Sequence, residues 1–299
     1  MSLALVLAGG GVAGIAWETG FLLGVQDESP ETASRLRRAD VLLGTSAGST
    51  VAAQLGSGVG LAELYARQLS ETTHEIGPHI DFGELMTLFE RAAADSSASV
   101  KRRLRLIGEL AVSAPTVALQ VRRAVIAKRL PSHDWPDRPL RITAIDVKTG
   151  ERVIFDRNSG VELIDAVAAS CAVPAVWPPV TIGGRQFMDG GVGSSANVDA
   201  VADHETVVML APTAEPGLSP FGRSLADELE QHRTGPALGI FADDASIAAF
   251  GRDPLDPRCR APSAIAGRDQ GRREAAGLAA FLAASAQVAA AEGEQPEAD

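Results

Sequence analysis

A serine stands between two glycines in the segment Gly44-Thr45-Ser46-Ala47-Gly48, which matches the pattern G-x-S-x-G. The segment follows a short apolar run and precedes a stretch of helical character. At such a strand-to-helix turn the serine hydroxyl is exposed at the apex, and the helix N-terminus stabilises nearby negative charge. The flanking glycines remove side chains that would clash in so tight a turn. The pattern indicates a nucleophilic serine, although by itself it fits a simple turn equally well.

A glycine-rich segment, Gly9-Gly10-Gly11-Val12-Ala13-Gly14, lies between another apolar run and another helical stretch. The backbone N–H groups of such a loop can bind an oxyanion or a phosphate. Gly9, Gly11 and Gly14 also satisfy the dinucleotide pattern G-x-G-x-x-G, which requires an acidic residue at the end of the second strand. Here Asp40 lies at the start of that strand. We therefore favour an oxyanion hole over a nucleotide site, and both over a turn without a ligand.

A carboxylate follows a third short apolar run, in Met188-Asp189-Gly190-Gly191. Two glycines after an aspartate allow close placement against another loop, although alone the segment fits an ordinary Asp-Gly turn. His204 and His232 follow Asp189, so a triad in the order Ser, Asp, His remains open. Neither histidine lies in a catalytic-looking motif, and we expect both to be solvated surface residues.

Taken together, the three motifs resemble the patatin-like phospholipase family. The stretch from Ala169 to Pro174, followed by Trp177 to Val180, resembles the family's segment before its aspartate, and the resemblance runs from residue 3 to about 210. It is weaker over 60–135 and after 211. One departure is Ala13, which stands where the family usually has a basic residue, and this puts rate or substrate preference in doubt.

The resemblance implies a lipid acyl hydrolase that cleaves carboxylic esters through an acyl-enzyme, without cofactor or metal. The implied nucleophile is Ser46 in the elbow of Gly44 and Gly48, and the implied base is Asp189 in the motif with Gly190 and Gly191. The implied oxyanion hole is Gly9, Gly10 and Gly11, with the amides of the last two holding the charge. A free aspartate is a weak base with a pKa of roughly 3.9, so burial or hydrogen bonding must compensate.

The elements that must position these motifs alternate between strands and helices, which indicates an α/β fold. The resemblance implies three α/β/α layers around a mostly parallel sheet. We expect one domain over 1–291, with a helical insertion or lid at 60–135 and a disordered acidic tail at 292–299. The expected strands are 3–8, 40–44, 140–147, 152–155, 180–182, 186–188 and 206–210. The expected helices are 12–25, 49–55, most of 60–130, 163–172, a stretch from about 224 to 250, and 271–291. Residues 26–39 should form a connection with a helical turn, and 251–263 should be irregular.

Composition narrows the choice of partners. The net charge of −11 gives no general electrostatic help for binding nucleic acid, so we exclude that class. Two cysteines and no Cys/His cluster favour a reducing compartment without structural zinc. No apolar run is long enough to span a bilayer, and we expect a soluble, cytoplasmic protein.

Residues 100–130 carry eight basic side chains around a largely apolar stretch and a single acid, Glu109. This segment fits either peripheral membrane contact or a lid with one solvated, charged face. Two other functions remain open: a nucleotide-binding α/β protein that uses Gly9 to Gly14, and a catalytically silent patatin-like binding protein.

Overall fold

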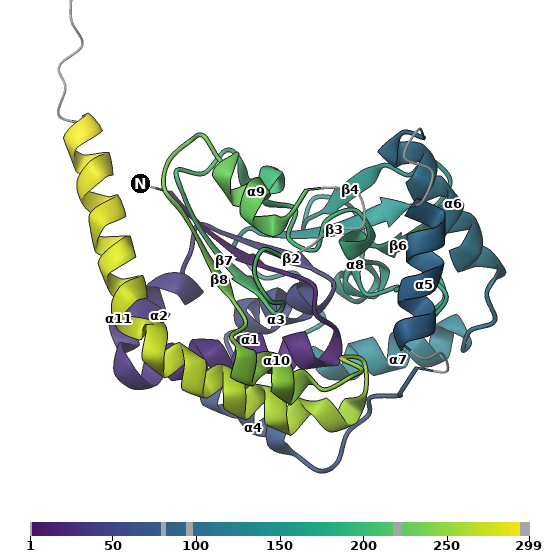
Figure 1. Cartoon of the computed structure of the whole chain (residues 1–299), viewed down its shortest axis with the longest axis horizontal. Coiled ribbons are helices and arrows are strands. Elements are labelled where there is room, and N and C mark those ends of the chain that lie inside the picture. Colours follow the sequence, from purple (N-terminus) through teal and green to yellow (C-terminus); the bar gives the residue numbers. More distant parts are fainter. Residues whose placement is uncertain (1, 79–81, 94–97, 218–222, 294–299) are drawn as a thin grey trace, which may run out of the picture.

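The computed structural model describes residues 2–78, 82–93, 98–217 and 223–293. Its centre is one eight-stranded sheet in the order β5-β6-β3-β2-β1-β7-β8, with β4 paired to β3 (Figure 1). The strands are β1 (Leu3–Leu7), β2 (Val41–Thr45), β3 (Leu140–Asp146), β4 (Arg152–Phe155), β5 (Val180–Ile182), β6 (Arg185–Asp189), β7 (Thr206–Ala211) and β8 (Ala237–Phe241). β3, β2, β1, β7 and β8 are parallel, whereas β4, β6 and β5 form the antiparallel end. The predicted mostly parallel sheet is confirmed.

Helices cover both faces of this sheet. They are α1 (Gly11–Glu28), α2 (Pro30–Arg37), α3 (Ala47–Gly56), α4 (Leu61–Leu69), α5 (Phe82–Ala93), α6 (Val100–Ser113), α7 (Leu119–Arg129), α8 (Leu163–Ser170), α9 (Leu225–Glu230), α10 (Asp244–Phe250) and α11 (Arg260–Gly293), with short 3₁₀ helices η1 (Gly190–Val192), η2 (Val198–Val201) and η3 (Pro257–Cys259). Alternate residues of each central strand point to opposite faces. In β1, Leu3, Leu5 and Leu7 belong to one core cluster with residues of α1, α3, α8 and α11. Ala4 and Val6 pack against the short helices η2 and α9, so three layers result.

The helices α1 and α11 lie side by side beneath the sheet (Figure 1). Glycines let them approach closely, because a Cβ at Gly20 would lie 2.1 Å from the carbonyl oxygen of Ala264. A Cβ at Gly267 would lie 2.3 Å from the carbonyl oxygen of Trp17. This contact fixes α1, and with it the glycine-rich loop at its N-terminus.

The helices α4 to α7 fall within the predicted helical insertion, and α5, α6 and α7 gather beside the antiparallel end of the sheet (Figure 1). The predicted breaks near Gly77-Pro78 and Pro115 lie between helices. The predicted hairpin is also present, and both Gly183 and Gly184 have a positive φ that suits a two-residue turn.

Three local predictions were wrong. The stretch predicted to be helical from about 224 to 250 contains the edge strand β8, which pairs with β7. Residues 26–39 contain the full eight-residue helix α2 rather than a single turn. The last helix begins at Arg260, not at 271, because Pro262 falls in its first turn, where a missing N–H costs no helical hydrogen bond.

The predicted acidic tail lies mostly outside the described residues, since α11 continues through Gly293 and 294–299 are not described. Among the residues that the structure describes, no helix is both long and apolar enough to cross a membrane.

Candidate active site

Ser46 occupies the turn between β2 and α3 in a backbone conformation that few side chains adopt. Its φ is 52° and its ψ is −116°, a region that costs of order 1–3 kcal/mol for a residue with a Cβ. Neighbouring groups hold the turn in place: the Ser46 amide donates to the Ser170 hydroxyl at 2.9 Å. Its carbonyl accepts from the Ser49 hydroxyl at 2.6 Å and from the Cys171 thiol at 3.2 Å. These three hydrogen bonds hold Ser46 in its strained backbone conformation, as the turn of a nucleophile elbow requires.

The two glycines of this turn are required by contact with backbone. A Cβ at Gly44 would lie 2.5 Å from the Cα of Ser49. A Cβ at Gly48 would lie 1.9 Å from the carbonyl oxygen of Leu7 in β1. Neither backbone neighbour can move aside, so the sequence pattern around Ser46 has a steric cause.

Asp189 ends β6 and meets Ser46 from across the sheet. The Ser46 hydroxyl donates to Oδ2 of Asp189 at 2.7 Å. The Gly191 amide donates to Oδ1 at 2.7 Å, which fixes the orientation of the carboxylate. A Cβ at Gly190 would lie 2.5 Å from the hydroxyl of Thr143, so only glycine lets the chain pass β3 this closely. Residues 143 positions apart in the sequence are thus joined by one short hydrogen bond.

Asp189 is buried, with 4% of the residue exposed. Burial raises the pKa of Asp189 to about 7, and hydrogen bonds from Ser46 and Gly191 together with the charge of Arg122 oppose part of that rise. A carboxylate with this pKa accepts a proton far more readily than a free aspartate at neutral pH. The geometry and the pKa together suit a general base for the Ser46 hydroxyl.

The glycine-rich loop follows β1, next to the turn that follows β2, because the carboxyl ends of adjacent parallel strands share one edge of a sheet. The Gly9 amide donates to the Ser195 carbonyl at 2.7 Å and so is already engaged. Across the described residues, the amides of Gly10 and Gly11 have no hydrogen-bond acceptor. Gly10 precedes the first turn of α1, whose N-terminus carries a partial positive charge. Two free amides at a helix N-terminus are the arrangement that an oxyanion needs.

Asp40 also bears on the nucleotide alternative. Its carboxylate accepts from the Leu3 amide at 2.7 Å, at the opposite edge of the sheet from the glycine-rich loop. It cannot contact a ribose bound near Gly9 to Gly14. This placement agrees with the sequence argument against a dinucleotide site.

Ser46 faces a small cavity between the sheet and the helical insertion. Gly11, Val12, Arg122, Trp177 and Leu255 are among its lining residues, and its volume is about 20 Å³. That is room for roughly one water molecule. An acyl ester therefore requires the side chains over Ser46 to move.

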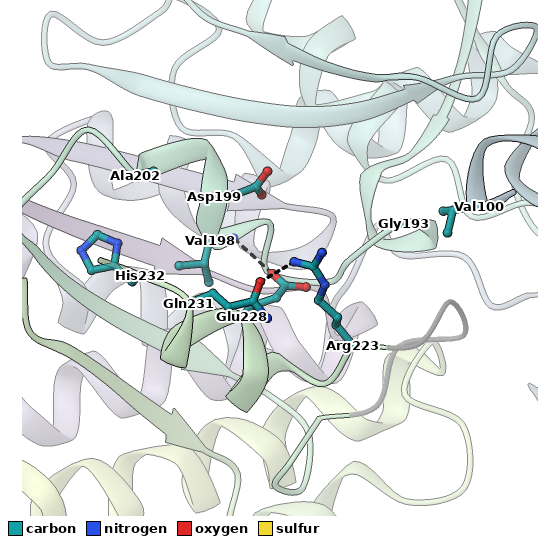
Figure 2. A pocket seen from close by; sticks show the side chains of 9 residues that line it. All are labelled: Val100, Gly193, Val198, Asp199, Ala202, Arg223, Glu228, Gln231 and His232. Atoms are coloured by element: carbon teal, nitrogen blue, oxygen red, sulfur yellow. Dashed lines mark hydrogen bonds between the residues drawn. The ribbon is translucent and has the colours of Figure 1, made fainter. Parts of the chain in front are cut away.

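The two histidines considered for a triad lie elsewhere. His204 contacts Asp203 at 3.0 Å, and in the described part of the chain neither His204 nor His232 hydrogen-bonds to Ser46 or Asp189. His232 lines a separate cavity of about 290 Å³ together with Asp199 and Glu228 (Figure 2). Figure 2 shows Glu228 accepting from the backbone of Val198, within a group of polar side chains that includes neither Ser46 nor Asp189. The cavity and the candidate active site are distinct.

Some residues around Ser46 were not predicted from the sequence as functional. Arg122, on α7, lines the same cavity as Ser46. The sequence indicates it only as one basic side chain of a possible membrane segment, whereas in the structure it is buried. Ser170 and Cys171 lie in the stretch whose resemblance to the family was noted, and that resemblance was the only signal for them.

Comparison with known proteins gives a match to the model of the patatin-like phospholipase family over residues 5–202. Among solved structures, the chain is similar to VipD from Legionella pneumophila, with 13% identity, a TM-score of 0.41, and coverage of 93% of this chain and 67% of VipD. It is also similar to ExoU from Pseudomonas aeruginosa in complex with SpcU, with 18% identity, a TM-score of 0.36, and coverage of 90% of this chain and 52% of ExoU. The chain therefore spans about half the length of ExoU.

The family match spans most of the sheet and both turns that flank the cavity, from β1 through η2. On this match, the chain belongs to the patatin-like phospholipase family.

Proposed function

We propose that the protein is a serine acyl hydrolase that cleaves carboxylic esters of lipids through Ser46 and Asp189. The observation that carries the proposal is the 2.7 Å hydrogen bond from the strained Ser46 hydroxyl to a buried carboxylate. Membership of a family named for phospholipases supports lipid esters as the substrate class. The nucleotide-binding alternative lacks an acidic residue for the ribose at the carboxyl ends of the parallel strands, where the glycine-rich loop lies.

In the proposed first step, Ser46 Oγ attacks the ester carbonyl carbon while Asp189 takes the hydroxyl proton. The amides of Gly10 and Gly11 hold the resulting oxyanion. Asp189 then gives its proton to the departing alcohol, which leaves an acyl group on Ser46. A water molecule that donates its proton to Asp189 attacks the acyl-enzyme, and collapse of this second intermediate releases the fatty acid and returns the proton to Ser46.

Access to Ser46 would require a small apolar cluster to part. Leu85 on α5 packs with Val176, Trp177 and Leu255, and the last two also line the cavity beside Ser46. The cluster joins the helical insertion to the loop before η3. We assign it as the cover of the site, consistent with the lid predicted at 60–135.

Contact with a lipid surface is assigned to α6. One side of this helix is buried through Leu104, Ile107 and Ala111. On the outer side, Leu106 is 41% exposed and Val112 is 52% exposed, and both line a groove with Arg102 and Arg105. Apolar side chains flanked by arginines suit the interface of an anionic bilayer. We narrow the proposed contact from segment 100–130 to α6, because the side chains of Arg122 and Arg129 on α7 are buried.

The test of this surface is sedimentation with vesicles of phosphatidylcholine and phosphatidylglycerol. Replacing Arg102 and Arg105 with Glu should reduce the bound fraction. A control with Arg38→Glu and Arg233→Glu changes the net charge equally and should retain more binding. Equal loss in both double variants would mean that net charge, not α6, determines the binding.

The test of the proposed reaction is hydrolysis of 4-nitrophenyl hexanoate by the wild type, Ser46→Ala and Asp189→Asn. Both variants should lose activity by at least about 10³-fold while circular dichroism shows intact folding. Activity that survives Ser46→Ala would refute the serine mechanism. Titration with NAD and ATP then tests the nucleotide alternative.

A further inference from the structure

Helix α7 directs two arginines toward the candidate active site. Arg122 and Arg129 are seven residues apart, about two helical turns, so they lie on the same side of the helix. Both line the cavity that contains Ser46. Of the two, Arg129 has a matched anion, because its Nε and Nη2 each donate to a carboxylate oxygen of Glu75 at 2.7 Å. This buried pair satisfies the charge of Arg129.

Arg122 has no such partner. Its residue is 4% exposed, and within the described residues its Nε and Nη1 atoms lack any hydrogen-bond acceptor. The guanidinium lies over the ring of Trp177, with Cζ 3.9 Å from the ring centroid. Stacking on an aromatic face compensates part of the lost hydration, but it leaves the N–H groups at the edge of the guanidinium unused. An unpaired buried charge is destabilising by several kcal/mol, which makes a purely structural role costly.

The nearby acidic groups are engaged with other residues. Glu75 is paired with Arg129, and the two oxygens of Asp189 accept from Ser46 and Gly191. Burial and the charge of Arg129 lower the pKa of Arg122 to about 9, which leaves it charged at neutral pH. The cavity thus presents a cation with free donors beside the candidate nucleophile.

We infer that Arg122 binds a phosphate group carried by the ester substrate, next to the carbonyl that Ser46 attacks. This inference rests on the proposed function and adds a specificity residue to it. A guanidinium presents two parallel N–H donors, a geometry that matches two oxygens of a phosphate. Arg122 also places a positive charge near the glycine-rich loop, because it lines the same cavity as Gly11. Esters with a phosphate beside the acyl group are therefore the preferred substrates.

The first experiment measures binding without catalysis. Isothermal titration calorimetry compares hexyl phosphate, hexanol and inorganic phosphate on the wild type, Ser46→Ala, Arg122→Gln and Arg123→Gln. Arg123 is the matched control, because it is the next residue on α7 and is half-exposed in ion pairs with Glu162 and Asp165. Arg122→Gln should weaken hexyl phosphate binding by about 10- to 100-fold, whereas the other two variants bind like the wild type.

Each arm has an outcome that decides the inference. Equal affinity of the wild type and Arg122→Gln for hexyl phosphate, or no binding to the wild type, overturns it. Binding of inorganic phosphate as tight as that of hexyl phosphate shows that a free anion, not a lipid headgroup, is the ligand, and this also overturns it. Arg122→Lys keeps the positive charge but lacks the two parallel N–H donors of a guanidinium. Its affinity for hexyl phosphate should fall between those of the wild type and Arg122→Gln.

The second experiment measures selectivity. The ratio of kcat/KM for dihexanoylphosphatidic acid to that for dihexanoylglycerol should fall by about 10-fold or more in Arg122→Gln and stay unchanged in Arg123→Gln. An equal loss on both esters would mean that Arg122 acts on Asp189 or on the fold, not on the phosphate. Hydrolysis of neither ester by the wild type would contradict the proposed function, and the binding experiment would still decide the role of Arg122.

Discussion

Replacing Asp189 with Asn should abolish activity and at the same time stabilise the protein above pH 7. The carboxyl group is buried and its pKa is raised from 3.8 to about 7, so ionising it in the folded state is unfavourable. Asparagine stays neutral and has nearly the same shape. Its oxygen can accept from the Gly191 amide, and its amino group can donate to the Ser46 oxygen, so both hydrogen bonds survive with one of them reversed.

The size of the gain follows from the pKa values. A pKa unit corresponds to about 1.36 kcal/mol, so the rise from 3.8 to about 7 corresponds to an upper limit of about 4 kcal/mol. Well below pH 3.8 both the folded and the unfolded wild type carry a neutral Asp189, and no charge penalty exists. As the pH rises toward 7, the unfolded chain ionises while the folded chain keeps its proton, so the wild type loses stability. Above pH 7 the difference is constant.

The assay is urea unfolding of the wild type and Asp189→Asn at several values between pH 4 and pH 8.5. We compare the free energy of unfolding of the variant with that of the wild type at each pH. The difference in favour of the variant should be roughly 1–4 kcal/mol larger at pH 8 than at pH 4, which corresponds to a melting temperature roughly 2–8 °C higher. Glu18, another buried carboxyl with a raised pKa, titrates in both proteins and cancels in the comparison. A stability difference that does not grow between pH 4 and pH 8, or that shrinks, would refute a buried Asp189 with a raised pKa.

Three further predictions concern Asp189, the ion pair of Glu75 with Arg129, and Gly48. The kcat/KM for 4-nitrophenyl hexanoate should rise with pH through about 7, because Asp189 must be ionised to accept a proton; a flat profile between pH 5 and pH 9 would exclude it as the base. Glu75→Gln should destabilise the protein by about 3 kcal/mol in urea unfolding, because it leaves buried Arg129 unpaired, and a cost under about 1 kcal/mol would contradict this. Gly48→Ala should prevent folding, since its Cβ would lie 1.9 Å from a backbone oxygen of β1, whereas Gly60→Ala, with open space around its Cβ, should fold normally by circular dichroism.

The sequence predicts the parts of the fold that local chemistry determines. Continuous apolar runs ending at glycines predict β1 and β2, and the Gly183-Gly184 pair predicts the β5–β6 hairpin. β8 is not predicted because it is an edge strand that pairs only with β7 among the described strands. Four of its five residues are only partly buried, so it lacks the continuous apolar run of a central strand. The early start of α11 escapes because the contacts that stabilise it come from α1, through glycines 240 or more residues away in sequence.

For the candidate site, the resemblance to the family implies that Ser46 and Asp189 meet, and the structure has a hydrogen bond between them. Their catalytic roles stay predictions. Sequence reasoning cannot find the direction of a side chain on an amphipathic helix next to a site formed elsewhere. Arg122 illustrates this, since in sequence it is indistinguishable from its surface neighbour Arg123. Sequence reasoning also cannot reveal that the Gly9 amide is already hydrogen-bonded, which leaves the amides of Gly10 and Gly11 as the expected donors.

Covalent labelling tests the central claim most directly. The protein is treated with an alkyl fluorophosphonate, and the modified residue is identified by peptide mapping with mass spectrometry. The proposed mechanism predicts one adduct, on Ser46, that is absent in Ser46→Ala and forms much more slowly in Asp189→Asn. Labelling of Ser46→Ala to the same extent as the wild type, or a folded wild type that does not react, would contradict a nucleophilic Ser46.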